Sequence, residues 1–303
     1  MPKSARSDPT KLAEISKTLA EALPFMRQFS GQTFVIKFGG HAMGDDDLAQ
    51  SFAEDIVMLR QVGIHPVVVH GGGPQIGEML ARLNIESAFV DGLRVTDRTT
   101  VDIVEMVLSG SINKQIVDSI QSAGGTAIGL SGKDGRLIEA RQMRRTTRDP
   151  DSNIEKILDL GFVGEPVTIN TKAIDVLRQS DIIPIIAPIG VGPRGQTYNI
   201  NADTAAGAIA GALGASKLLM LTDIAGVLDE NNEVMPTLSK KQATQLMKDG
   251  VITGGMIPKV ETCLEAVRGG TSAVHILDGR IKHVLLLEVF TEHGVGTMIR
   301  ADD

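Results

Sequence analysis

Three glycine-rich segments stand where an anion could bind. Lys37-Phe38-Gly39-Gly40 ends one apolar stretch, His70-Gly71-Gly72-Gly73-Pro74 ends another, and Gly254-Gly255-Met256 precedes a predicted helix that carries Lys259. Consecutive glycines let backbone N–H groups approach an anion closely, and a helix start adds the positive end of its dipole. Lysine is rarely buried, so Lys37 inside an apolar strand favours a phosphate contact. The alternatives are tight turns and a sheet-edge lysine that reaches solvent.

A second set of polar residues follows later in the chain. Asn199-Ile200-Asn201-Ala202-Asp203 places two amides and a carboxylate at a predicted strand-to-helix junction. Capping of the helix accounts for Asn201 and Asp203 but not for Asn199, which shares a face with Asn201 on an extended chain. Arg94 follows a predicted turn and is able to clamp a carboxylate with two hydrogen bonds, although surface arginines are common. Lys259 in a first helical turn opposes the helix dipole, which favours an anionic ligand or solvent beside it.

Of two common nucleotide-binding signatures, one is absent from the sequence and the other occurs in an unsuitable context. The Gly132-Lys133 pair is followed by Asp134, so the Walker pattern GxxxxGK[ST] is absent. A GxGxxG pattern occurs at 190–195, but Pro193 interrupts it and a strand-like segment follows it instead of a helix. This segment is predicted to be a hairpin.

Composition narrows the possible partners and the compartment. The 303 residues carry a net charge of −7, so nucleic acid is not an expected partner. The first thirty residues are charged throughout and do not read as a signal peptide, and the longest apolar run, 182–191, is too short to span a bilayer. The single cysteine, Cys263, fits a packing role in a reducing compartment. We therefore expect a cytoplasmic protein without a membrane partner.

Strand and helix patterns alternate along the whole chain, which predicts an α/β fold. The expected architecture is a three-layer αβα sandwich with a mostly parallel central sheet in two lobes, and a site at the carboxyl ends of the strands. Strands are predicted at 33–38, 66–70, 126–130, 137–140, 161–169, 182–187, 217–221 and 273–277, with a hairpin over 190–200. Helices are predicted at 10–29, 47–62, 74–83, 171–179, 202–213, 239–249 and 258–268, with two more over 97–123 that break near Gly110.

Six motifs occur in an order that resembles the acetylglutamate kinases of the amino acid kinase family. They are Val-Ile-Lys-Phe-Gly-Gly, Val-Val-His-Gly-Gly-Gly, Asp-Gly-Leu-Arg-Val-Thr, Asn-Ile-Asn-Ala-Asp, Leu-Thr-Asp-Ile-Ala-Gly-Val-Leu and Gly-Gly-Met-Ile-Pro-Lys, and the match runs from about residue 34 to 299. Aspartokinases typically have threonine or serine where this chain has His41. Another member acting on carbamate, aspartate or a nucleoside monophosphate, or a non-catalytic amino acid sensor, remains an alternative.

The resemblance implies phosphoryl transfer from ATP to the side-chain carboxylate of N-acetyl-L-glutamate, in arginine biosynthesis. It implies an N-terminal oligomerisation helix over 1–30, an amino-acid and dimerisation lobe over 31–195 and an ATP lobe over 196–303. Mg²⁺ is expected on the ATP phosphates, with no metal bound by the protein alone. The acceptor carboxylate is ionised at pH 7, so no general base is needed. The implied residues are Lys37, Lys259 and Asp203 for catalysis, Gly72, Gly73, Arg94, Asn199 and Asn201 for the amino acid, and Gly39, Gly40, Thr222, Asp223, Gly254, Gly255 and Met256 for ATP.

The N-terminal helix and the segment 287–298 further resemble the arginine-inhibited members of this family. In those enzymes the helix joins dimers into a hexamer and arginine binds beside it, which implies an allosteric site at Lys217, Glu288, Gly294 and Gly296. The alternative is a helix that docks on its own subunit and a plain C-terminal turn. His70 and the Arg144-Arg145 pair are given no role and are read as a strand-end histidine and a solvated loop.

Overall fold

The structure, a computed structural model, describes residues 9–90, 92–148, 155–292 and 294–302. It confirms the α/β class and the mostly parallel sheet. Eight strands form one sheet in the order β14-β16-β15-β13-β1-β2-β10-β5, and β16 runs antiparallel to β15. The helices are α1 (Pro9–Phe29), α2 (Asp46–Gln61), α3 (Gly73–Arg82), α4 (Arg98–Glu105), α5 (Asn113–Ser122), α6 (Lys172–Gln179), α7 (Ala202–Ala212), α8 (Lys240–Lys248), α9 (Met256–Arg268) and α10 (Val284–Phe290). The sheet strands are β1 (Thr33–Phe38), β2 (His65–His70), β5 (Ala127–Ser131), β10 (Ile183–Ala187), β13 (Lys217–Thr222), β14 (Thr237–Ser239), β15 (Ala273–Asp278) and β16 (Thr297–Arg300).

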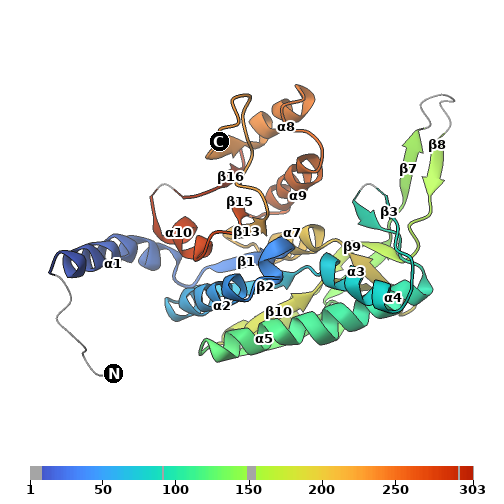
Figure 1. Cartoon of the computed structure of the whole chain (residues 1–303), viewed down its shortest axis with the longest axis horizontal. Coiled ribbons are helices and arrows are strands. Elements are labelled where there is room, and N and C mark those ends of the chain that lie inside the picture. The colour runs from blue at the N-terminus through green and yellow to red at the C-terminus, as the bar shows by residue number, and fades with distance from the viewer. Residues whose placement is uncertain (1–8, 91, 149–154, 293, 303) are drawn as a thin grey trace.

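Helices cover both faces of the sheet (Figure 1). Side chains of β1 alternate between the faces: Phe34 and Ile36 pack in the apolar cluster formed with α2 and α5. Val35 belongs to the other cluster, with Ile209 of α7 and residues of α9. Lys37 lies two residues after Val35, and therefore faces α7. These two clusters confirm the predicted three layers.

The central strands end together at one edge of the sheet. In the parallel register of β1 and β2, Phe38 pairs with His70, so the glycines after both strands emerge side by side. On the other side of β1, Lys37 pairs with Met220 of β13, which ends two residues later at Thr222. The predicted placement of the site at the carboxyl ends of strands rests on this register.

The predicted break near Gly110 is wrong. Helix α4, a π-helical segment (Met106–Ile112) and α5 follow one another without interruption. The buried side chains of Val107, Leu108 and Ile112 hold the segment against the core, and helical hydrogen bonding continues past the exposed glycine.

Several short elements escaped the sequence analysis. They are a 3₁₀ turn (Gly40–Met43), a 3₁₀ turn (Asp134–Arg136), β3 (Phe89–Val90), β4 (Leu93–Arg94), β7 (Arg145–Arg148), β8 (Glu155–Leu158), β14, α10 and β16. Arg145 thus begins a strand that pairs with β8, where the prediction was a solvated loop. These elements are too short, or too dependent on a distant partner, to leave a clear periodic pattern.

Beside the sheet lies a small closed barrel of β6 (Ile138–Gln142), β9 (Val163–Ile169), β11 (Ile189–Val191) and β12 (Thr197–Ile200). Strands β11 and β12 form the predicted hairpin. The predicted lobe boundary after residue 195 falls inside this hairpin and stays a prediction. Helix α1 extends away from the rest of the chain at one end, beside α10 (Figure 1). In the part of the chain that the structure describes, no helix is long and apolar enough to cross a membrane.

Candidate active site

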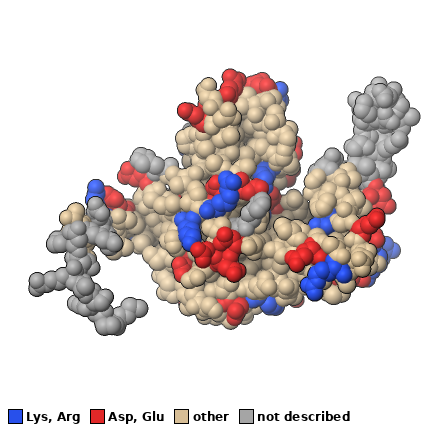
Figure 2. Space-filling view, viewed as in Figure 1, with Lys and Arg blue, Asp and Glu red and all other residues tan. Residues whose placement is uncertain are grey.

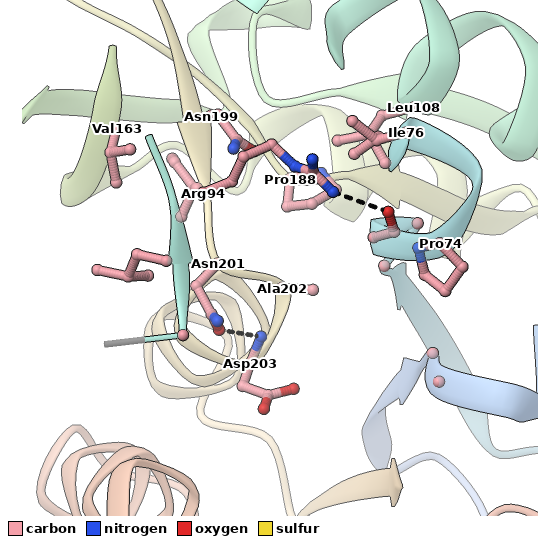
Figure 3. A pocket seen from close by; sticks show the side chains of 18 of the residues that line it. Pro74, Ile76, Arg94, Leu108, Val163, Pro188, Asn199, Asn201, Ala202 and Asp203 are labelled. Atoms are coloured by element: carbon pink, nitrogen blue, oxygen red, sulfur yellow. Dashed lines mark hydrogen bonds between the residues drawn. The ribbon is translucent and has the colours of Figure 1, made fainter. Parts of the chain in front are cut away.

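The ends of β1, β2 and β10 and the junction of β12 with α7 surround a cavity of about 300 Å³ (Figure 3). Nine of the residues predicted from the sequence line it. They are Lys37, Gly39, Gly40, Gly72, Gly73, Arg94, Asn199, Asn201 and Asp203. Segments far apart in the sequence therefore meet at one place, as predicted.

Asp203 holds two lysines. Its Oδ1 lies 3.0 Å from Lys37 Nζ, and its Oδ2 lies 3.5 Å from Lys259 Nζ. The side chains of Lys37 and Asp203 are only 9% and 14% exposed. Lys259 does not line the cavity itself, but its ammonium group contacts Asp203, which does line the cavity.

Positive charge exceeds negative charge around Asp203. Burial acts to raise the pKa of Asp203, but the ammonium groups of Lys37 and Lys259 outweigh it and hold the pKa below its usual value. The carboxylate is therefore ionised at neutral pH. One carboxylate against two ammonium groups leaves a net charge of about +1 at the edge of the cavity, which suits an anionic ligand.

Asn201 places Asp203 by capping helix α7. Its Oδ1 accepts hydrogen bonds from the backbone N–H groups of Asp203 (2.8 Å) and Thr204 (3.2 Å), and Figure 3 draws the first of them. The capping alternative for Asn201 is thus confirmed for its oxygen. Asn199 does not cap the helix, and its Nδ2 contacts Thr96 Oγ1 at 3.4 Å.

Arg94 is buried and already anchored. Its Nη2 donates to Gly73 O at 2.9 Å, its Nη1 contacts Ser87 Oγ, and its guanidinium stacks on Phe89, 4.5 Å from the ring centre. Burial lowers the pKa of Arg94 from its high ordinary value, and arginine stays charged at neutral pH. The fixed guanidinium is ready to receive a carboxylate without much loss of side-chain freedom.

Some of the glycines of the cavity are sterically required, whereas a Cβ on Gly73 would meet nothing within 4 Å. A Cβ on Gly72 would lie 2.4 Å from Ile112 Cδ1, and one on Gly39 would lie 3.0 Å from Lys37 Nζ. Gly40 has φ +73, which favours glycine. The backbone of both loops therefore faces the cavity without side chains in between.

The residues predicted to bind ATP are only partly assembled around the cavities. Gly39 and Gly40 line the first cavity, while Asp223 lines a second of about 850 Å³ with Asp45, Asp47, Arg280 and Lys282. Figure 2 shows that acidic and basic side chains adjoin one another near the centre of the face of the molecule that it draws. Thr222 is buried at the end of β13, and Gly254, Gly255 and Met256 line neither of these two cavities.

The predicted effector residues gather around a histidine that the sequence analysis did not single out. His275 Nδ1 lies 2.6 Å from Glu288 Oε1, and its Nε2 lies 3.0 Å from Lys217 Nζ, which in turn lies over the ring of Phe29 in α1. Burial lowers the pKa of His275, with Glu288 opposing the shift. The fold itself requires the two glycines: a Cβ on Gly294 would lie 2.7 Å from Glu288 Oε2, and one on Gly296 would lie 2.1 Å from Ile276 O.

This chain is similar to known proteins over most of its length. A model of the amino acid kinase family matches residues 32–278. The acetylglutamate kinase of Rhodospirillum centenum is 64% identical over 284 residues, which cover 94% of this chain and 93% of that protein.

Among solved structures, N-acetylglutamate synthase from Neisseria gonorrhoeae is similar in two complexes. With coenzyme A and N-acetyl-glutamate it gives a TM-score of 0.81 at 26% identity, covering 95% of this chain and 64% of that chain. With coenzyme A and L-arginine it gives 0.77 at 25% identity, covering 94% and 65%. This chain thus spans about two thirds of the synthase. The family match and the near full-length relative show that the chain belongs to the amino acid kinase family and, within it, to the acetylglutamate kinases.

Proposed function

We propose that this chain transfers the γ-phosphoryl group of ATP to the side-chain carboxylate of N-acetyl-L-glutamate, forming N-acetyl-L-glutamyl 5-phosphate and ADP. The observation that carries the proposal is the pairing of Asp203 with both Lys37 and Lys259 at the cavity. Phosphoryl transfer to a carboxylate brings two anions together and needs little covalent help from the protein. An excess of fixed positive charge serves that need.

Each residue then has a role that follows from its position. Lys37 and Lys259 neutralise charge on the transferring phosphoryl group, and Asp203 keeps both ammonium groups in place. Arg94 and Asn199 hold the amino acid, together with backbone N–H groups of Gly72 and Gly73. Because the acceptor is already ionised, no residue is required to remove a proton.

Mg²⁺ is proposed to enter on the ATP phosphates. No group of three or more His, Cys, Asp or Glu side chains suited to a metal ion occurs among the described residues. Magnesium commonly binds through substrate phosphates and one or two carboxylates, so such a cage is not needed. When bound, the ion would neutralise phosphate charge, and Asp223 beside the second cavity is a candidate carboxylate.

One assay tests the substrate. ATP consumption is measured in a coupled assay with N-acetyl-L-glutamate, glutamate, aspartate and carbamate in parallel. We expect turnover with N-acetyl-L-glutamate that exceeds each of the others by at least about tenfold in kcat/KM. Preference for carbamate or aspartate would assign the chain to another reaction, and binding without turnover would make it a sensor. The predicted cytoplasmic location is part of the same proposal.

Arginine is proposed as an inhibitor that binds at Lys217, His275 and Glu288. Glu288 supplies a carboxylate for a guanidinium, and Phe29 links the cluster to α1. The related synthase, solved with L-arginine, is consistent with such a ligand. Inhibition requires that arginine bind two conformations of the chain unequally, since an effector with equal affinity for both shifts nothing.

Assembly through α1 is part of the same proposal. Leu12, Leu19 and Leu23 of this helix are 49%, 60% and 46% exposed. A helix with a row of exposed leucines is suited to pair with another copy of itself. We propose that α1 joins dimers into a hexamer.

A further inference from the structure

His70 is a fully buried histidine that no role proposed above uses. It ends β2, directly before the glycines of the cavity. Its Nδ1 lies 2.9 Å from Gly71 O, and its Nε2 lies 3.2 Å from Asn113 Nδ2. A polar ring enclosed in this way has to satisfy its hydrogen bonds inside the protein.

The surrounding groups decide which ring nitrogen carries the proton. Lys114 Nζ donates to Asn113 Oδ1 at 3.1 Å, so the other amide atom of Asn113, Nδ2, is the donor that faces His70 and Ile185 O. His70 Nε2 therefore accepts, and Nδ1–H donates to Gly71 O. Burial lowers the pKa of His70 to about 4, so the ring is neutral at pH 7 as this arrangement requires.

The contact with Gly71 O orients the peptide that follows. In a trans peptide the C=O and N–H groups point to opposite sides, so holding Gly71 O toward His70 directs Gly72 N–H away from it. Gly72 lines the cavity and His70 does not. Gly72 is also the N-cap of α3, and within the described chain no hydrogen bond occupies its N–H.

The residues around Asn113 leave space for its amide group. A Cβ on Gly129 would lie 1.7 Å from Asn113 Oδ1, so only glycine leaves room for the amide there. Asn113 directly follows the π-helical segment, whose Leu108 and Ile112 pack against Gly72. Irregular helical turns of this kind are frequent at functional sites.

We propose that His70, held by Asn113, is a positioning residue that turns the Gly71–Gly72 peptide so that Gly72 N–H donates to an anionic oxygen of the bound amino acid. The identity of that ligand rests on the proposed function. The orientation of the peptide rests on the contacts of His70 alone.

Two amide substitutions at His70 separate positioning from packing. His70→Asn keeps a donor near the place of Nδ1, whereas His70→Gln moves the amide to the place of Nε2 and withdraws it from Gly71 O. We expect the Asn variant to keep the KM for N-acetyl-L-glutamate within about threefold, and the Gln variant to raise it by about tenfold or more, with the KM for ATP nearly unchanged in both. Titration calorimetry with N-acetyl-L-glutamate gives the same comparison without turnover.

Further variants keep the test decisive if His70→Gln does not fold. Asn113→Ala removes the partner of His70 without touching the cavity, and is expected to raise the same KM by several-fold, on the order of the effect of one hydrogen bond. His65→Asn, at the other end of β2, is the control and should change neither KM. Equal behaviour of His70→Asn and His70→Gln, or an unchanged KM in a folded Asn113→Ala, overturns the positioning role alone. A wild-type protein that neither binds nor phosphorylates N-acetyl-L-glutamate overturns the proposed function and the ligand named here.

Discussion

Lys37 Nζ and Asp203 Oδ1 lie 3.0 Å apart, one at the end of the central strand β1 and the other in the first turn of α7. The contact joins the carboxyl end of β1 to helix α7, which packs against one face of the sheet. It holds the lysine beside two glycine loops and fixes its ammonium group before any ligand arrives. Preorganised charge of this kind accelerates a reaction because it needs no rearrangement at the moment of transfer.

Removal of either lysine should therefore slow phosphoryl transfer. We expect Lys37→Ala and Lys259→Ala each to lower kcat by about 10² or more, since one preorganised donor typically contributes a few kcal/mol. The loss should be at least as large for Lys37, which is closer to Asp203 and more buried. Steady-state kinetics measure it, with the exposed Lys248→Ala as control. Near-normal turnover in either variant would refute the assigned roles.

Arg94 should act mainly on binding of the amino acid. We expect Arg94→Ala to raise the KM for N-acetyl-L-glutamate and to leave the KM for ATP nearly intact, because a clamp on a remote carboxylate contributes binding energy. Arg94→Lys keeps a charge but not the planar fork that reaches Gly73 O and Ser87, so it should recover only part of the loss. Equal changes in both KM values would count against this role.

Some residues of the site could be predicted from the sequence, and others depend on contacts between distant segments. Lys37 was found because a lysine in an apolar strand is a local departure from a pattern, and the parallel register of β1 and β2 brings it to the edge where both glycine loops emerge. An acid in the first turn of a helix is ordinary, so the role of Asp203 came from the family resemblance and not from a local pattern. His70 and His275 are also polar residues in buried strands, and the same signal was available for them. Their partners Asn113 and Glu288 come from separate helices whose packing no single sequence window reveals. The short strands β14 and β16 were missed because they exist only through pairing with distant segments.

Asp55 should make stability depend on pH. Burial raises the pKa of Asp55 to about 6, against the opposing contact with His283. Between its unfolded pKa and about 6, the folded protein binds a proton that the unfolded chain releases, so the free energy of unfolding contributed by Asp55 falls as pH rises. From pH 5 to 7 we expect this contribution to fall by about 1 kcal/mol, and Asp55→Asn should lack it. Urea unfolding of both proteins at several pH values measures the difference, and parallel curves would contradict it.

Exposed leucines of α1 should determine the assembly. Replacing Leu12, Leu19 and Leu23 by serine removes the apolar row and keeps the contact of Phe29 with Lys217. We expect the mass in solution to fall from that of a hexamer to that of a dimer, as it should on deletion of residues 1–29. Light scattering measures the mass, and Leu83→Ser, an exposed leucine after α3, is the control. A wild-type protein that is already a dimer would remove this role from α1.

Arginine sensitivity should depend on Glu288. Its Oε1 pairs with His275 and its Oε2 accepts from Val295 N–H at 2.8 Å, so this carboxylate joins β15, α10 and the turn that follows. Glu288→Gln keeps the size of the side chain and a hydrogen-bonding oxygen but removes the charge that a guanidinium requires. We expect the arginine concentration for half inhibition to rise by about tenfold or more, because a charged pair in a partly buried site contributes roughly 1.5 kcal/mol or more. The kcat in the absence of arginine should change little. Glu292→Gln, an exposed acid nearby, should leave inhibition as it is. If millimolar arginine leaves the wild-type enzyme untouched, the regulatory site is wrong, while the roles of Lys37, Asp203 and Lys259 stand on their own kinetics.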